Sequence, residues 1–382
     1  MAENTFQSDV DFLKKYFEVH VLRNDEGGRA IVIPALQGRT MTSSSKGDDG
    51  QSYGFIQYET FDKPLDPKIN LYGGEDRIWI SPEGGQFSVF FDPDVPMDFA
   101  NWRTPKFLDT EVYEVVKKND TLITTKNSTA LMNMSGYVFD IELERTVELL
   151  STEAAAKCLG TNVDGVSLVA QESRNKLTNT GDKTWSQETG LIGLWAICMS
   201  KPSPSATLMI PFRQGDQAEL GTIVTSDYFG ELGSDRLVVN EELGMIFLSG
   251  DGDYRSKLGL SEKRALPLMG SWDAERCVLT VVQFNMPETA PYGYTNNLWE
   301  FQEQPYAGDV INGYNDGPND SGGKLGGFYE LETISPAYAL AAGEARTHIQ
   351  RITRIEGERD KLDAISKSVF DVSLDQVESQ LS

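Results

Sequence analysis

The chain has few of the residues on which several common kinds of site depend. It contains 3 cysteines and 2 histidines in 382 residues. Cys158, Cys198 and Cys277 are far apart and none has CxxC spacing, which argues against a disulfide framework and a structural zinc site. His20 and His348 are isolated, and no Ser–His–Asp arrangement, P-loop or dinucleotide-binding motif is present. We therefore expect no cofactor and assign no metal site.

Basic residues and long apolar runs are also scarce. Lys and Arg total 34 against 58 Asp and Glu, a formal charge of −24. Such a charge repels nucleic acids and anionic membrane surfaces, which bind clustered cations. No apolar run is long enough to span a bilayer, and the first residues lack the basic and apolar regions of a signal peptide. We expect no nucleic-acid partner and no membrane insertion. We expect either a cytoplasmic protein or a periplasmic or other extracytoplasmic one whose signal has been removed, and the sequence does not determine the oligomeric state.

Short apolar runs are abundant. Hydrophobic residues make up 39% of the chain and aromatic residues 10%, enough for a sizeable core. Phe139, Ile141 and Leu143 alternate with acidic residues at the period of two that is typical of a strand. We predict strands at residues 29–36, 86–91, 121–125, 137–150, 166–171, 191–199, 206–212, 236–240, 245–250, 277–284 and 346–357.

Turn signals rich in Gly, Asn and Asp separate these runs, at residues 24–28, 46–50, 82–85, 179–183, 250–253 and 312–323. Many strands joined by turns favour a sandwich or barrel over a parallel sheet with crossover helices. The predicted fold class is mainly β, a large antiparallel β-sandwich. We expect one domain over residues 1–382, with a C-terminal helical tail at 358–381.

A few helices are also predicted. The N-terminal one begins at Ser8 and places Val10, Leu13 and Phe17 on one face, with His20 at its end. A second spans 152–159 and ends at the glycine that follows it. In the tail, one helix covers 358–370, and Ser373 with Gln376 three residues later forms a capping-box pattern for another.

Residues 70–87 form the first candidate functional segment. Two glycine pairs allow close backbone approach, and Glu75, Asp76, Arg77, Trp79 and Glu83 lie between or beside them. Charged groups can bind sugar hydroxyls, and an indole can pack on the apolar face of a sugar ring. The alternative is a solvated turn with an internal Arg–Asp pair and a core tryptophan.

The second segment is residues 249–257. Asp251 and Asp253 flank a glycine, as in part of a calcium loop, but the remaining ligands of an EF-hand are absent. The functional interpretation is a turn that displays Tyr254 and Arg255 on the rim of a site. The alternative is a plain hairpin turn.

The third segment, residues 291–318, is rich in Tyr and Asn. It includes Asn297, Trp299, Asp309 and Asn315, and its low hydrophobic periodicity disfavours a core strand. Long loops of this kind tend to carry binding groups, so we predict a binding loop. Whether a calcium ion lies among Asp309, Asp316 and their neighbours stays open.

The fourth segment is residues 328–334. Glu330 and Glu332 share one face of a probable strand, and Leu331 and Thr333 share the other. Two acids on one face of a strand are usually exposed to solvent. If this face lines a pocket instead, they become candidates for acid–base chemistry.

Four stretches together resemble the aldose 1-epimerase (galactose mutarotase) superfamily. NLYGGEDRIW at 70–79 is similar to its Asn-Leu-His-Gly-Gly segment, and LTNTGDKTW at 177–185 to its Leu-Thr-Asn-His segment. YELETISPAYALAAGE at 329–344 resembles its late strand, and IPALQGRTM at 33–41 its early strand. The GGEDRIW, GDGDYRSK and YNDGP stretches resemble a bacterial branch without an assigned activity.

The resemblance implies a mutarotase-like supersandwich and a carbohydrate ligand. It also implies that Glu332 stands where the family has its base glutamate. Tyr72 and Thr180 stand where the family has its histidines, so the usual imidazole acid is missing. We therefore predict Glu332, Glu83 and Tyr72 as catalytic candidates. The predicted substrate-binding residues are Arg39, Glu75, Arg77, Trp79, Tyr254, Arg255, Asn297, Trp299, Asp309 and Asn315.

Three functional hypotheses follow. The first is an enzyme acting on a sugar or glycoside, either epimerase-like or glycoside-processing, with Glu332 as base and Tyr72, Glu75 or Glu83 as acid. The second is a carbohydrate-binding protein without catalysis, which would use the same aromatic residues. The third is an interaction or structural protein with a vestigial pocket. A structure in which Trp79, Trp299 and Glu332 do not share one cavity would favour the third hypothesis.

Overall fold

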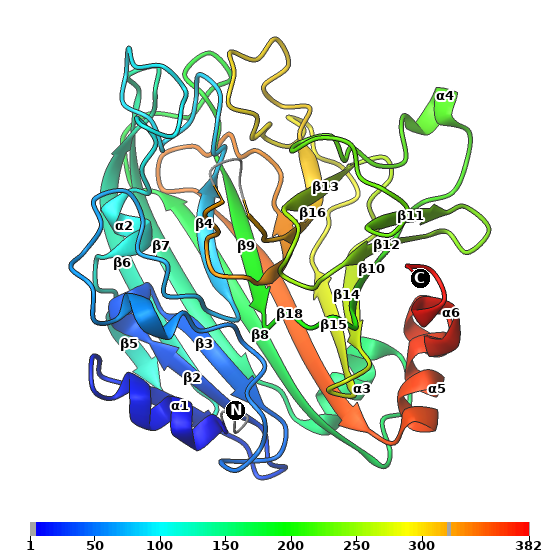
Figure 1. Cartoon of the computed structure of the whole chain (residues 1–382). Helices are drawn as coiled ribbons and strands as arrows, with labels where there is room; N and C mark the ends of the chain where they lie inside the picture. Colours follow the sequence, from blue (N-terminus) through cyan, green and yellow to red (C-terminus); the bar gives the residue numbers. More distant parts are fainter. Residues whose placement is uncertain (1–4, 319–321, 382) are drawn as a thin grey trace.

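The computed structural model describes residues 5–318 and 322–381, so positions 319–321 of the turn predicted at 312–323 lie outside the described residues. The described part is mainly β, as predicted, with three antiparallel sheets (Figure 1). The largest sheet has the order β11 (Leu237–Asn240), β12 (Met245–Ser249), β10 (Ala206–Pro211), β14 (Leu268–Asp273), β15 (Val278–Phe284), β18 (Ala345–Gly357), β8 (Val166–Asn179), β7 (Val138–Leu149), β6 (Leu122–Met132) and β5 (Glu114–Lys118).

The second sheet has the order β13 (Ser256–Ser261), β16 (Asp309–Asn315), β17 (Tyr329–Ile334), β9 (Gly193–Ser200) and β4 (Arg77–Ser81). The third contains β1 (His20–Arg23), β2 (Arg29–Ile33) and β3 (Arg39–Ser44). The helices are α1 (Phe6–Leu13), α2 (Lys106–Asp109), α3 (Thr152–Leu159), α4 (Gln217–Leu220), α5 (Arg359–Phe370) and α6 (Leu374–Glu378), with 3₁₀ turns at Pro34–Leu36 and Tyr58–Thr60. None of the helices in the described ranges is long and apolar enough to cross a membrane.

The five-stranded sheet packs one face on the ten-stranded sheet. Thr333 of β17 donates a hydrogen bond to Gln350 of β18 (2.8 Å) and lies 2.9 Å from the Nε2 of His348. Leu331, two residues before Thr333, is fully buried in the core between the sheets. The alternation of side chains along a strand then places Glu330 and Glu332 on the opposite face, as predicted from their parity.

Several predicted elements are confirmed at their ends. Helix α3 has Ser151 as its N-cap and ends at Gly160, whose φ is +67°. Helix α6 begins with the capping box formed by Ser373 and Gln376. Helices α5 and α6 bury Leu362, together with other apolar residues, against the outer face of the ten-stranded sheet, at the right of Figure 1.

Other predictions are wrong. Residues 86–91 form turns and irregular backbone instead of a strand, because Phe90 and Phe91 pack on Trp102 and Trp299. Residues 309–315, predicted as part of a long loop, form β16 inside the second sheet. The first helix is capped by Thr5 and ends at Leu13, so residue 17 and the histidine at 20 lie beyond it.

Candidate functional site

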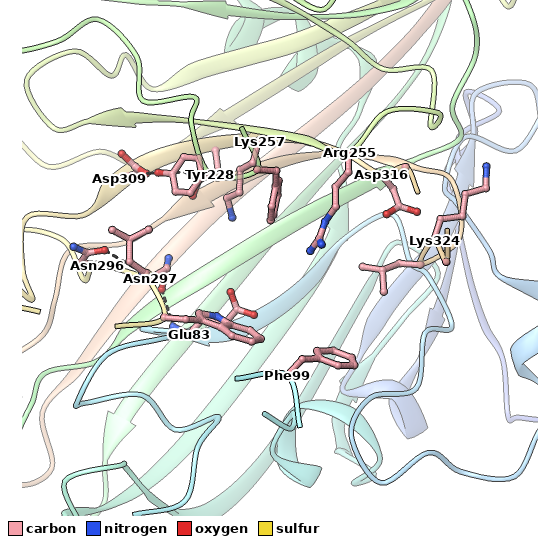
Figure 2. Close-up of a pocket in the computed structure, with 17 residues that line it drawn as sticks. Glu83, Phe99, Tyr228, Arg255, Lys257, Asn296, Asn297, Asp309, Asp316 and Lys324 are labelled. Atoms are coloured by element: carbon pink, nitrogen blue, oxygen red, sulfur yellow. Dashed lines mark hydrogen bonds between the residues drawn. The ribbon is translucent and has the colours of Figure 1, made fainter. Parts of the chain in front are cut away.

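A cavity of about 670 Å³ opens on the face of the five-stranded sheet that points away from the ten-stranded sheet. This volume is within the range of small-molecule sites. Two cationic side chains of the 255–257 segment point into it from one side, and the loop carrying Glu83 and the side chain of Phe99 face them from the other (Figure 2). The lining residues are Glu83, Phe99, Tyr228, Phe229, Arg255, Lys257, Asn296, Asn297, Leu298, Trp299, Asp309, Asn312, Asp316, Gly317, Gly323, Lys324 and Leu325.

Two of the predicted segments are joined to each other at the cavity wall. The backbone N–H of Glu83 donates to the side chain of Asn297 (2.7 Å). Gln86 donates to the carbonyl of Gln302 (3.0 Å), and the N–H of Gln302 donates back to Gln86 (3.1 Å). At Gly84 an added Cβ would lie 2.3 Å from a backbone carbonyl of the 291–308 loop. The turn at 82–85 therefore needs glycine for this close approach.

Glu83 is the carboxylate on the cavity wall with the clearest potential for proton transfer. Burial raises the pKa of Glu83, and the nearby Glu332 carboxylate raises it further. The cations Lys257 and Arg255 and a hydrogen bond from Trp299 act in the opposite direction without cancelling the rise. A carboxyl group whose pKa is raised in this way keeps its proton to a higher pH than a solvated glutamate, and in the acid form it can donate a hydrogen bond to a ligand.

Lys257 connects the cavity to the Glu332 carboxylate behind it. Its Nζ is 3.4 Å from Oε2 of Glu332, which also accepts a hydrogen bond from the indole of Trp195 (2.9 Å). Glu332 is 1% exposed and does not line the cavity. Burial lowers the pKa of Lys257, but Glu332, Glu83 and Glu330 together outweigh burial, so the net shift is upward. The ammonium therefore stays charged at neutral pH.

The predicted residue Arg77 lies in the layer behind the cavity. It forms an ion pair with Glu330 (3.1 Å), and its guanidinium is 4.5 Å from the ring centre of Trp79. Glu330 and Glu332 are thus both buried and each is paired with a cation. This differs from the usual case, in which two acids on one strand face are exposed to solvent. Burial raises the pKa of Glu330, and the Arg77 charge opposes that rise.

Asp309 and Asp316 line the cavity, and protein donors occupy both oxygens of Asp316 and the Oδ2 of Asp309. The hydroxyl of Tyr228 and the amide of Asn312 donate to Asp309. Asp316 accepts from the hydroxyl of Tyr314 (3.0 Å) and from the backbone N–H groups of residues 326 and 327 (2.9 and 2.8 Å). Within residues 5–318 and 322–381, no group of three or more His, Cys, Asp or Glu could hold a metal ion.

Aromatic rings make up the remaining wall. Trp299 stacks on Trp102 with ring centres 6.0 Å apart and an angle of 18° between planes, and Phe99 stacks on the same Trp102 at 6.0 Å and 15°. Trp102 is buried, whereas Phe99 is 59% exposed and Trp299 is partly exposed at the cavity. A rigid, partly exposed indole backed by a second indole can pack against an apolar ligand face.

Three predicted residues are not brought to the cavity. Tyr72 packs against Phe17 and Phe61 in a separate apolar cluster, which is formed between the third sheet and α1. Arg39 donates to the carbonyl of residue 73 (2.7 Å), and burial lowers its pKa to about 9. Glu75 is fully buried and accepts from Arg354 (2.9 Å) between the sheets. All three side chains are buried and their contacts stabilise the fold away from the cavity wall.

Two more predicted residues lie next to the cavity without lining it. The side chain of Tyr254 is 44% exposed and stacks near the guanidinium of Arg236 at 5.3 Å. Asn315 donates to the carbonyl of Tyr254 and to Asp251, both at 2.9 Å. These contacts fix the turn that precedes β13, and so position Arg255.

The prediction from sequence missed Lys257, Tyr228, Phe229, Phe99, Asn296, Asn312 and Lys324. One of these carried a usable signal. Lys257 is two residues after Arg255, and residues two apart share a face of a strand. Tyr228 and Phe229 belong to an irregular segment far from the other lining residues in sequence, and no local pattern relates them to the site.

The family model described as "Family of unknown function (DUF6786)" matches residues 4–381. The chain belongs to this family. A search of the curated proteins gives no match for this DUF6786 chain.

The solved structures similar to this chain include aldose 1-epimerase-like and galactose mutarotase-like proteins. A candidate aldose 1-epimerase from Klebsiella pneumoniae is 10% identical, with a TM-score of 0.52 over 95% of this chain and 84% of that chain. The Slr1438 protein from Synechocystis sp. PCC 6803 is 15% identical, with a TM-score of 0.51 over 90% of this chain and 96% of that chain. A galactose mutarotase-like protein from Lactobacillus casei is 11% identical, with a TM-score of 0.48 over 88% and 100% of the two chains. The first two likenesses show that the DUF6786 chain has the aldose 1-epimerase-like fold expected from its sequence.

Proposed function

We propose that this protein binds a saccharide in the cavity and that Glu83 is the acid–base group that acts on it. The observation that carries the proposal is the placement of Glu83, Lys257 and Trp299 on the walls of one cavity. A stacking surface, a carboxyl group with a raised pKa and a buried cation together suit a ligand that has hydroxyl groups and an apolar ring face. The mutarotase-like fold supports the carbohydrate class by analogy.

The proposed role of Glu332 differs from that implied by the family resemblance. Its carboxylate is 1% exposed, does not line the cavity and is held by Trp195 and Lys257. A general base must come within hydrogen-bond reach of the proton that it removes. We therefore assign Glu332 as a positioning residue that orients and charges Lys257, and we assign contact with the substrate to Glu83.

A second candidate function is saccharide binding without turnover. The burial of Glu332 favours it, because the residue that the resemblance implies as base does not reach the cavity. In that case Glu83 and Asn297 contribute hydrogen bonds only, and a chemical step is absent.

Calorimetric titration of the purified protein with a panel of mono- and oligosaccharides tests the binding proposal. Proton NMR of each ligand that binds then measures anomer exchange and glycoside cleavage. The enzymatic function predicts turnover that Glu83→Gln abolishes while binding is retained. Binding without turnover by the wild-type protein supports the second candidate. If no saccharide binds, both candidates are wrong.

A further inference from the structure

Arg255 is the cavity cation that lacks a counter-ion. Lys257 pairs with Glu332 and Lys324 pairs with Asp253, each at 3.4 Å. The guanidinium of Arg255 lies over the ring of Phe229 at 4.0 Å. Within residues 5–318 and 322–381 no hydrogen bond or ion pair holds it, and its Nε is buried without a partner. A guanidinium that is partly removed from water and unpaired is unfavourable unless a ligand supplies the missing acceptor.

The acidic residues of the cavity do not serve as the counter-ion of Arg255. Both oxygens of Asp316 already accept hydrogen bonds from protein donors, and Asp309 is held by Tyr228 and Asn312. The carboxyl of Glu83 lies on the opposite wall, across the open space that Arg255 and Lys257 face (Figure 2). The structure thus leaves one positive group directed at the space that the ligand would fill.

Close packing of the backbone fixes the position of Arg255. An added Cβ at Gly317 would lie 2.3 Å from the backbone nitrogen of Arg255 and 2.5 Å from the carbonyl carbon of Tyr254. On the other side, the side chain of Asn315 binds the carbonyl of Tyr254. The contact with Phe229 restrains the guanidinium, and the terminal Nη groups have no hydrogen-bond partner within the described residues, so they can donate to an oxyanion.

We propose that the ligand of this cavity is an anionic saccharide whose carboxylate, sulfate or phosphate group pairs with Arg255. This inference rests on the proposed function, because it takes the cavity to be the saccharide site. The formal charge of −24 opposes a long-range attraction of anions, so recognition depends on the direct pair with the guanidinium. The neutral part of the ring packs on Trp299 across the cavity.

The experiment compares matched ligands by calorimetric titration: glucose, galactose and mannose, their uronic acids, and their 6-sulfates and 6-phosphates. The wild-type protein should bind at least one acidic member about 10- to 100-fold more tightly than its neutral parent, and high salt should reduce this preference. The acidic series that shows the strongest preference (uronic acids, 6-sulfates or 6-phosphates) identifies the anionic group that Arg255 binds. Arg255→Met should remove the preference, because it should weaken binding of the acidic sugar far more than binding of its neutral parent.

Two further variants make the outcome specific to Arg255. Arg255→Lys keeps the positive charge but lacks the paired N–H donors of a guanidinium, so it should retain part of the preference. Arg346→Met removes a cation that does not line the cavity and should leave the affinities for both kinds of sugar unchanged.

If neutral and acidic sugars bind equally, or if Arg255→Met weakens both equally, the anionic class is wrong and saccharide binding stands. If no sugar of either kind binds, the proposed function is wrong as well. If Arg255→Met does not fold, the wild-type preference and its salt dependence decide.

Discussion

Lys257 on the cavity wall and the buried Glu332 of β17 form an ion pair (3.4 Å). The two residues belong to β13 and β17, which are separated in the sheet by β16. Glu332 is 1% exposed, and its Oε2 also accepts from the indole of Trp195. The ion pair therefore connects Lys257, which lines the cavity and can contact a ligand, with Glu332, which cannot.

The first prediction concerns this ion pair. Lys257→Met removes the cation and leaves Glu332 buried without its charge partner, so the free energy of unfolding should fall by about 3 kcal/mol. Urea denaturation measures the loss. The double variant Lys257→Met/Glu332→Gln removes the stranded charge and should recover part of the stability. A double variant as unstable as the sum of the two single variants would show that the two residues are not coupled.

The second prediction concerns the protonation state of Glu83. Because burial raises the pKa of Glu83 above its ordinary value of 4.5, the acid form persists to higher pH than in a solvated glutamate. A ligand that accepts a hydrogen bond from this acid should bind more weakly as the pH rises through the raised pKa. Titrations over a range of pH measure the effect. Glu83→Gln, which stays neutral, should bind with an affinity that no longer depends on pH in this range; an unchanged pH dependence would contradict the role.

The third prediction concerns stability in acid. His348 is fully buried, and burial lowers its pKa from 6.5 to about 4. A depressed histidine pKa means that the unfolded chain takes up a proton first, so stability present above pH 6.5 is lost as the pH falls toward 4. The contribution is about 3 kcal/mol. The difference in unfolding free energy between wild type and His348→Gln should shrink by this amount over that interval. A difference that is constant with pH would contradict the assignment.

The fourth prediction concerns the aromatic wall. Trp299→Ala should weaken saccharide binding at least fivefold, about 1 kcal/mol, because it removes the exposed stacking surface. Phe301→Ala is the matched control, since Phe301 belongs to the same loop, is 76% exposed and does not line the cavity. Calorimetric titration should show a loss for the first variant only. Equal losses, or none, would place the ligand elsewhere.

The strand pattern of the sequence was sufficient to predict the fold class and part of the site. The parity of Glu330 and Glu332 on one strand face is confirmed, because it depends only on the period of a strand. The segments 82–85, 255–257 and 291–316 meet at one cavity, but Trp79 and Glu332, which the site hypothesis placed in the same cavity as Trp299, do not line it. The helix ends at 160 and 373 are also confirmed, since caps are determined by local chemistry.

Partner choice could not be predicted, because it depends on tertiary packing. Glu75, Asp76 and Arg77 are consecutive, and an internal pair between the last two was one interpretation. In the structure Glu75 binds Arg354, Asp76 binds Arg145 and Arg77 binds Glu330, residues up to 279 positions away. The same limit applies to residues 86–91, whose apolar run resembles a strand but fills an aromatic cluster instead.

The most direct test of the account is a crystal structure of the protein soaked with the saccharide that binds most tightly in titration. We predict a sugar ring packed on Trp299, with a polar atom within hydrogen-bond distance of the Glu83 carboxyl group. A sugar bound at any other surface, with the cavity of Glu83 and Lys257 empty, would contradict it.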